Sequence, residues 1–82
     1  MLDVKIPIFD AVGTGENITK LRKQKHLSVR EIQEAFGFET PQAIYKWQHG
    51  SAMPTIENLA ILAAIFEVKV DDILVFHEQQ AA

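Results

Sequence analysis

The chain has 82 residues, enough for one small domain with a modest hydrophobic core. Hydrophobic residues make up 48% of it, too large a share for a disordered protein, and the absence of cysteine excludes disulfides and thiolate zinc sites. The net charge of −3 by itself argues against nucleic-acid binding, but the charge is unevenly distributed along the chain. Residues 18–50 hold six basic and three acidic side chains, whereas the flanking segments together hold two basic and eight acidic ones. The basic middle therefore indicates a local anion-binding face.

No membrane or export signal is visible in the chain. No run of 18 apolar residues is present, and the N-terminal segment MLDVKIPIFD lacks the basic start of a signal peptide. We therefore expect a cytoplasmic protein with no membrane partner.

Residues 1–13 are expected to form an extended arm. Val4, Ile6 and Ile8 alternate as in a strand, and Pro7 and Gly13 interrupt any helix. Two arrangements stay open: the arm packs on its own domain, or it pairs with a second copy of the chain.

The next two helices follow from apolar spacing and capping. The first is expected from Thr14 or Gly15 to about Lys25. The second starts at the sequence SVRE, residues 28–31, which fits a capping box between Ser28 and its third helical residue. Gly37 stands where a left-handed residue ends a helix. The buried stripes of the two helices are Ile18 and Leu21, then Val29, Ile32 and Phe36.

A third helix follows after three or four residues, the connection length of a helix-turn-helix. Thr40 is a suitable N-cap, Pro41 suits the first helical position, and the helix is expected to run to His49 before Gly50. Its apolar anchors are Ile44 and Trp47.

The C-terminal part is expected to hold two more helices. Thr55 caps a helix over residues 56–66, and a short helix over residues 71–76 starts at two aspartates. Residues 77–82 are expected to fray. The predicted organisation is an arm at 1–13, a helical domain at 14–77 and a disordered tail at 78–82.

These segments resemble the phage-repressor-like helix-turn-helix family, of the lambda repressor and Cro type. The resemblance covers about residues 14–75 and lies in the combination SVREIQEAFG, TPQAIYKWQHG and MPTIENLAILAAIFEVKVDDIL. It implies an all-α fold of five helices with an N-terminal arm. It also implies a prokaryotic or phage-like DNA-binding protein.

The sequence departs from the family pattern at three places. Where the family usually has alanine, the second helix has Gln33, and the turn that follows is one residue longer. Val29 stands where a glutamine often braces a phosphate, and Glu67 stands where glycine usually ends the fourth helix. A left-handed Glu67 is expected to be mildly strained.

In this family the third helix enters the DNA major groove while the second crosses the backbone. The resemblance therefore implies base contacts from Thr40, Gln42, Ala43 and Lys46. It implies backbone contacts from a larger set: Lys20, Arg22, Lys23, Lys25, Ser28, Arg30, Tyr45 and Gln48.

The fourth helix is apolar on nearly all sides. Ile61, Ala64 and Ile65 lie outside its main core stripe and are candidates for a dimer interface. The alternative is that they form extra core beneath the N-terminal arm.

No residue pattern points to an enzyme, a metal, a cofactor or a small-molecule effector. The three histidines lack ligand-like spacing, and GTGEN at 13–17 lacks the context of a phosphate loop. We expect a sequence-specific transcriptional regulator that binds double-stranded DNA, and specifically a repressor that binds a pseudo-palindromic operator as a homodimer. The alternative is a protein-interaction or regulatory module without base reading.

Overall fold

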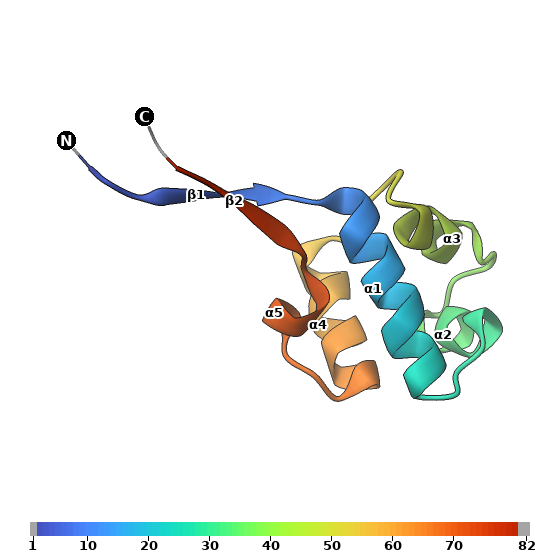
Figure 1. Ribbon diagram of the computed structural model, residues 1–82. Coiled ribbons are helices and arrows are strands. Elements are labelled where there is room, and N and C mark those ends of the chain that lie inside the picture. The colour runs from blue at the N-terminus through green and yellow to red at the C-terminus, as the bar shows by residue number, and fades with distance from the viewer. Residues whose placement is uncertain (1, 81–82) are drawn as a thin grey trace.

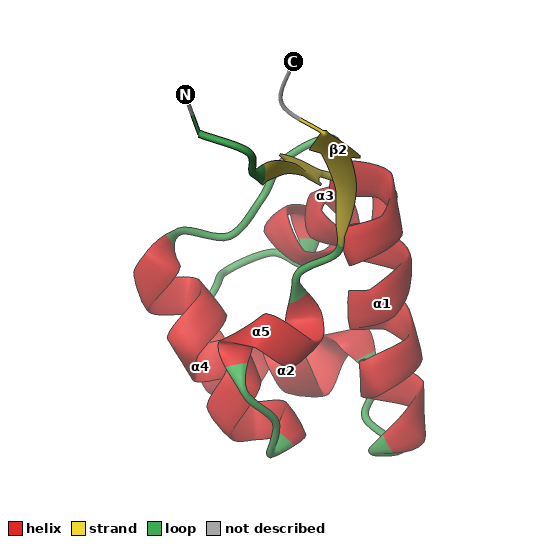
Figure 2. Cartoon of the chain, turned by 60° about the vertical axis from the view of Figure 1, so that its left-hand side comes forward, coloured by secondary structure: helices red, strands yellow, loops and turns green. Residues whose placement is uncertain are grey.

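The computed structural model describes residues 2–80 and contains five helices and a two-stranded antiparallel sheet (Figures 1 and 2). The expected all-α class therefore needs correction, because a β-ribbon accompanies the helices. In chain order the elements are β1 (Lys5–Phe9), α1 (Ala11–Gln24), α2 (Val29–Phe36), α3 (Gln42–His49), α4 (Ile56–Phe66), α5 (Val70–Ile73) and β2 (Phe76–Gln80).

The helices surround one hydrophobic core to which all five contribute. Most of its members belong to the apolar stripes that the sequence predicts. The buried core residues are Ile18, Ile32, Ile44, Trp47, Leu62, Ala63, Phe66 and Ile73. No helix among residues 2–80 is long and apolar enough to cross a membrane.

Helix α1 begins at Ala11, three residues before the expected start, because Asp10 acts as its N-cap. The Asp10 carboxylate accepts a hydrogen bond from the Gly13 amide at 2.8 Å. Gly15 is buried against α3, and a Cβ there would lie 2.4 Å from the carbonyl oxygens of Trp47 and Gln48. Glycine at this position therefore permits close helix packing, and does not mark a turn.

Helices α2 and α4 begin and end as predicted. Ser28 and Glu31 form the capping box, and Thr55 accepts from the amide of Asn58. Gly37 and Glu67 both have left-handed backbones at the C-terminal ends, with φ of 73° and 57°.

The predicted cap of α3 is wrong. Pro41 occupies the N-cap position, and no side chain caps the helix. The backbone of this segment puts Pro41, and not Thr40, next to the first helical residue, so the Thr40 hydroxyl makes no cap.

Helix α5 is shorter than expected and ends at Ile73, because Leu74 is already extended. The next residue bonds to the start of α1. The Val75 amide donates to the Thr14 hydroxyl at 2.9 Å, and its carbonyl accepts from the Asp10 amide at 2.9 Å. These bonds guide the chain into β2.

Strand β2 pairs with β1 from Phe9 opposite Phe76 to Lys5 opposite Gln80. The arm is thus held by its own chain, and residues 77–80 form a strand where fraying was expected; residues 81 and 82 lie outside the described residues. The ribbon projects away from the helices (Figure 1). Ile6, Ile8 and Phe9 therefore stay exposed, and the arm does not become extra core over α4.

Candidate nucleic-acid interface

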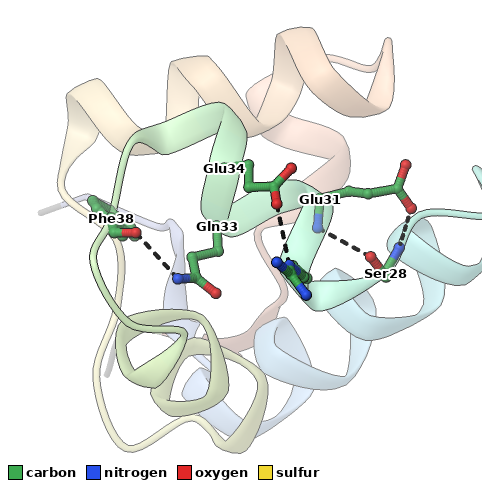
Figure 3. A network of polar contacts seen from close by, with 6 residues as sticks. Ser28, Glu31, Gln33, Glu34 and Phe38 are labelled. Atoms are coloured by element: carbon green, nitrogen blue, oxygen red, sulfur yellow. Dashed lines mark hydrogen bonds and ion pairs between the residues drawn. The ribbon is translucent and has the colours of Figure 1, made fainter.

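Helices α2 and α3 form a helix-turn-helix whose connection is braced from inside. The Gln33 side-chain amide donates to the carbonyl of Phe38 at 3.2 Å, as Figure 3 shows. The rings of Phe36 and Phe38 stack with centroids 5.0 Å apart, and both meet Trp47 edge-on. The larger residue at position 33 and the longer turn are therefore linked by a direct hydrogen bond.

The orientation of α3 is set by its buried side. Ile44 is fully buried and Trp47 is 4% exposed, so the opposite side of the helix faces solvent. The end of α3 lies close to the start of α1, where a Cβ on Gly50 would lie 2.8 Å from the Ala11 carbonyl oxygen. Contacts at both Gly15 and Gly50 hold α3 against α1.

Three of the four predicted base-contacting residues are exposed. Thr40 precedes α3, and Gln42 and Lys46 lie one turn apart on the same side of it. Ala43 is half-buried and packs against the core, so its methyl group is turned partly inward. The exposed part of the set is a glutamine amide, a lysine ammonium and a threonine hydroxyl.

Two residues predicted to contact the DNA backbone bond within the protein. The Arg22 Nε donates to the Gln48 side-chain oxygen at 2.9 Å, and Arg22 Nη1 donates to the Leu27 carbonyl at 2.9 Å. Both side chains are half-buried. They tie α1 to α3 and to the start of α2.

Of the other residues predicted to contact the DNA backbone, some already bind other groups of the protein. Lys25 pairs with Glu67 at 3.1 Å and Arg30 with Glu34 at 3.2 Å. The Ser28 hydroxyl and amide are used by the capping box. Tyr45 is exposed.

Four lysines form no ion pair within residues 2–80: Lys20 and Lys23 on α1, Lys46 on α3, and Lys69 at the start of α5. All four are exposed. They are the cations most available to phosphate in the described part of the chain.

Two features that position this surface were not predicted. One is the Arg22–Gln48 tie, which joins residues 26 apart in the chain and has no local signal. The other is Gly15, whose place inside α1 could be found only by recognising the Asp10 cap. A capping residue three positions before Gly13 was the available signal.

The Asp10 carboxylate also bonds to His77 Nε2 of β2 at 2.8 Å. The Gly13 amide and then this histidine lower the pKa of Asp10, because both favour the ionised carboxylate. The group lies at the base of the ribbon, at the start of α1. Within residues 2–80, no three His, Asp or Glu side chains gather as a metal site.

A helix-turn-helix family model matches residues 18–73. The chain belongs to the lambda-repressor-like helix-turn-helix family. This membership supports a DNA-binding transcription regulator, in a family that is typically non-enzymatic.

Two solved structures share the fold. The DNA-binding domain of BldD and that of the S. venezulae BldD each match with a TM-score of 0.67 and 24% identity. Each match covers 79% of this chain, and 93% and 96% of the respective domains. No curated protein matches the chain.

Proposed function

We propose that this protein is a sequence-specific repressor that binds a pseudo-palindromic operator as a homodimer. Its third helix, α3, lies in the major groove, and α2 crosses the DNA backbone. Gln42 and Lys46 read base edges, and Thr40 contacts a base or a thymine methyl group.

The observation that carries this proposal is the division of α3 into two sides. Ile44 and Trp47 hold one side in the core, while Gln42 and Lys46 project from the other. A glutamine amide matches the N6 and N7 atoms of adenine, and a lysine ammonium matches O6 and N7 of guanine. A helix that served only to cover the core would not need this pair of groups on its outer side.

The electrostatic part of the binding is assigned to the unpaired lysines of α1 and α3. Lys23 adds positive charge on α1 to that of Lys46 on α3. Lys20 lies on the side of α1 that faces α5 and β2, where it shares a hollow with Glu16 and Asp72. Arg22 acts indirectly, since its guanidinium holds Gln48 and thereby fixes α3. Lys25 and Arg30 reach phosphate only by exchanging a carboxylate partner for it.

The test is DNA binding by fluorescence anisotropy at several salt concentrations. On the DNA fragment that binds most tightly, the logarithm of the affinity is expected to fall linearly with the logarithm of the salt concentration, with a slope of about −0.9 per neutralised phosphate. Lys23→Ala should make the slope less steep by about 1, because one phosphate contact is lost.

Lys69→Ala is the matched control, since Lys69 is the exposed N-cap residue of α5 and lies outside the helix-turn-helix. It should leave both affinity and slope unchanged. Failure to bind any genomic fragment at low salt would refute the proposal and favour the interaction-module alternative. Binding that does not respond to salt would refute the assigned lysine contacts.

A further inference from the structure

The β-ribbon exposes an unusual amount of aliphatic surface. Ile6 and Ile8 share one face of β1 and are 41% and 44% exposed. Leu2 and Val4 precede them in the same alternation and are 79% and 39% exposed. Across the ribbon this face carries only His77 and Gln79.

Little within the chain stabilises the ribbon. It extends the molecule to 49 Å in length, against 23 and 20 Å in the other two directions (Figures 1 and 2). Its side-chain contacts include an edge-on Phe9–Phe76 pair at 5.5 Å, a solvent-exposed Lys5–Glu78 ion pair at 3.9 Å and, at its base, the His77–Asp10 bond at 2.8 Å. A two-stranded ribbon is marginally stable in water unless a further strand or surface joins it.

The two free edges of the ribbon differ. The bond from the Asp10 amide to the Val75 carbonyl shows which residues of β1 turn their backbone groups toward β2. By the alternation of antiparallel strands, Ile6 and Ile8 do the same, while Lys5, Pro7 and Phe9 turn theirs outward. Pro7 has no N–H, so it interrupts the outer edge of β1 and disfavours strand addition there.

The outer edge of β2 has no such block. Phe76, Glu78 and Gln80 oppose the outward residues of β1, so their own N–H and C=O groups also point outward. This edge is a template for one more strand.

We propose that β2 pairs, antiparallel, with β2 of a second copy of this chain, which forms a four-stranded sheet in the order β1–β2–β2–β1. This pairing deepens the homodimer of the proposed function and rests on that dimer. A twofold axis perpendicular to the sheet keeps the aliphatic faces of both ribbons on the same side. Pro7 then lies on both outer edges and ends the sheet at four strands, so the assembly closes as a dimer.

A second copy fits the ribbon better than DNA does. The fixed charges on and beside the ribbon are Asp3, Lys5, Asp10 and Glu78, an acidic excess that disfavours phosphate. The exposed side of α4, with Ile61 42% exposed, is the other apolar surface. Its backbone groups are already bonded inside the helix, whereas those on the edge of β2 are not.

Sedimentation velocity of the full chain over a range of concentrations tests the pairing. Glu78→Pro removes an outward N–H while leaving the bonds between β1 and β2, and should raise the dimer dissociation constant about tenfold or more. Glu78→Ala, the matched control, loses the same carboxylate but keeps the amide, and should remain dimeric. Circular dichroism should show the same helix content in both.

A second measurement uses the absence of cysteine. Single substitutions His77→Cys, Glu78→Cys and Gln79→Cys place one thiol each along β2. If the twofold axis passes through one of these positions, the two copies of that residue lie opposite each other, with their Cα atoms within disulfide reach. The cysteine variant at that position should then form a covalent dimer in high yield on mild oxidation. Ile61→Cys on α4 should give none.

A wild type that stays monomeric at all concentrations would overturn the pairing. So would a dimer that Ile61→Glu dissociates and Glu78→Pro does not, because the contact would then lie on α4. If the protein binds no DNA but Glu78→Pro still dissociates its dimer, the repressor proposal fails and the β2 pairing stands.

Discussion

At the scale of single residues, α3 shows how periodicity alone separates buried from exposed side chains. Ile44 and Trp47 are three residues apart, and both are buried as the helical spacing predicts. Gln42 and Lys46 then have to face outward. The hydrogen bond of Gln48 could not be predicted from this spacing, because its partner Arg22 lies on another helix.

Replacing Gln42 or Lys46 by alanine should weaken binding to the preferred operator. A bidentate base contact is worth about 1–3 kcal/mol of discrimination, which corresponds to a loss between several-fold and about a hundred-fold. Gln42→Ala should leave non-specific binding almost intact, whereas Lys46→Ala should also reduce the salt slope. Anisotropy on specific and scrambled duplexes measures both effects.

Two controls frame this prediction. Gln24→Ala removes an exposed glutamine near the end of α1, outside the helix-turn-helix, and should change neither affinity nor stability. Trp47→Ala should destabilise the fold by about 3–5 kcal/mol, because it empties a buried site. Unchanged operator affinity in both α3 surface variants would show that this helix does not read the bases.

At the scale of elements, the helix ends divide into those set locally and those set by neighbours. Ser28 and Thr55 cap their helices through residues three positions away, which the sequence displays. Helix α5 stops early because Val75 bonds to Thr14, 61 positions away in the chain.

The backbone strain at Glu67 leads to a prediction at this scale. This residue ends α4 in the left-handed conformation, with φ 57° and ψ 44°. Glycine adopts this conformation without a Cβ penalty, so Glu67→Gly should stabilise the domain by about 0.5–1 kcal/mol, less the entropy that glycine adds to the unfolded chain. Urea unfolding measures the change. The comparison is with Glu67→Gln, which also loses the exposed Lys25 ion pair but keeps a side chain. Glycine no more stable than glutamine would argue against strain at this residue.

At the scale of the whole molecule, Asp10 joins the helical domain to the ribbon. Its carboxylate caps α1 and bonds to His77 of β2, and the adjacent backbone bonds continue into the sheet. The start of α1, the end of α5 and the ribbon therefore depend on one ionised group.

This linkage predicts a loss of stability in acid. Because the pKa of Asp10 is lower in the folded protein than its ordinary value of 3.8, the carboxylate stabilises the fold above that value. The contribution is lost as the pH falls through the lower, folded-state pKa. Urea midpoints between pH 6 and pH 2 should therefore fall less steeply in Asp10→Ala than in the wild type.

Asp71→Ala is the control for general acid effects, because Asp71 is an exposed carboxylate at the start of α5. It should follow the wild-type pH profile more closely than Asp10→Ala does. Parallel profiles for Asp10→Ala and the wild type would exclude a special role for the Asp10 cap.

The sequence by itself determined what depends on short-range chemistry. Apolar stripes, the Ser28 and Thr55 caps, the left-handed glycines and the short α2–α3 connection each involve residues only a few positions apart. These signals were enough to predict α2, α3 and α4 with nearly correct bounds, and the family that the comparisons confirm. The same periodicity predicted that Gln42, Tyr45 and Lys46 are exposed.

Only the tertiary structure decided what depends on residues far apart in sequence. The pairing of residues 5–9 with 76–80 has no local signal, because it depends on the fold of the helices between them, which brings the two ends of the chain together. The close approach at Gly15, and the diversion of Arg22 and Gln48 into a mutual hydrogen bond, arise from the packing of α1 on α3. Free energy from these long-range contacts can override a local preference, as at Gly15, which lies inside a helix.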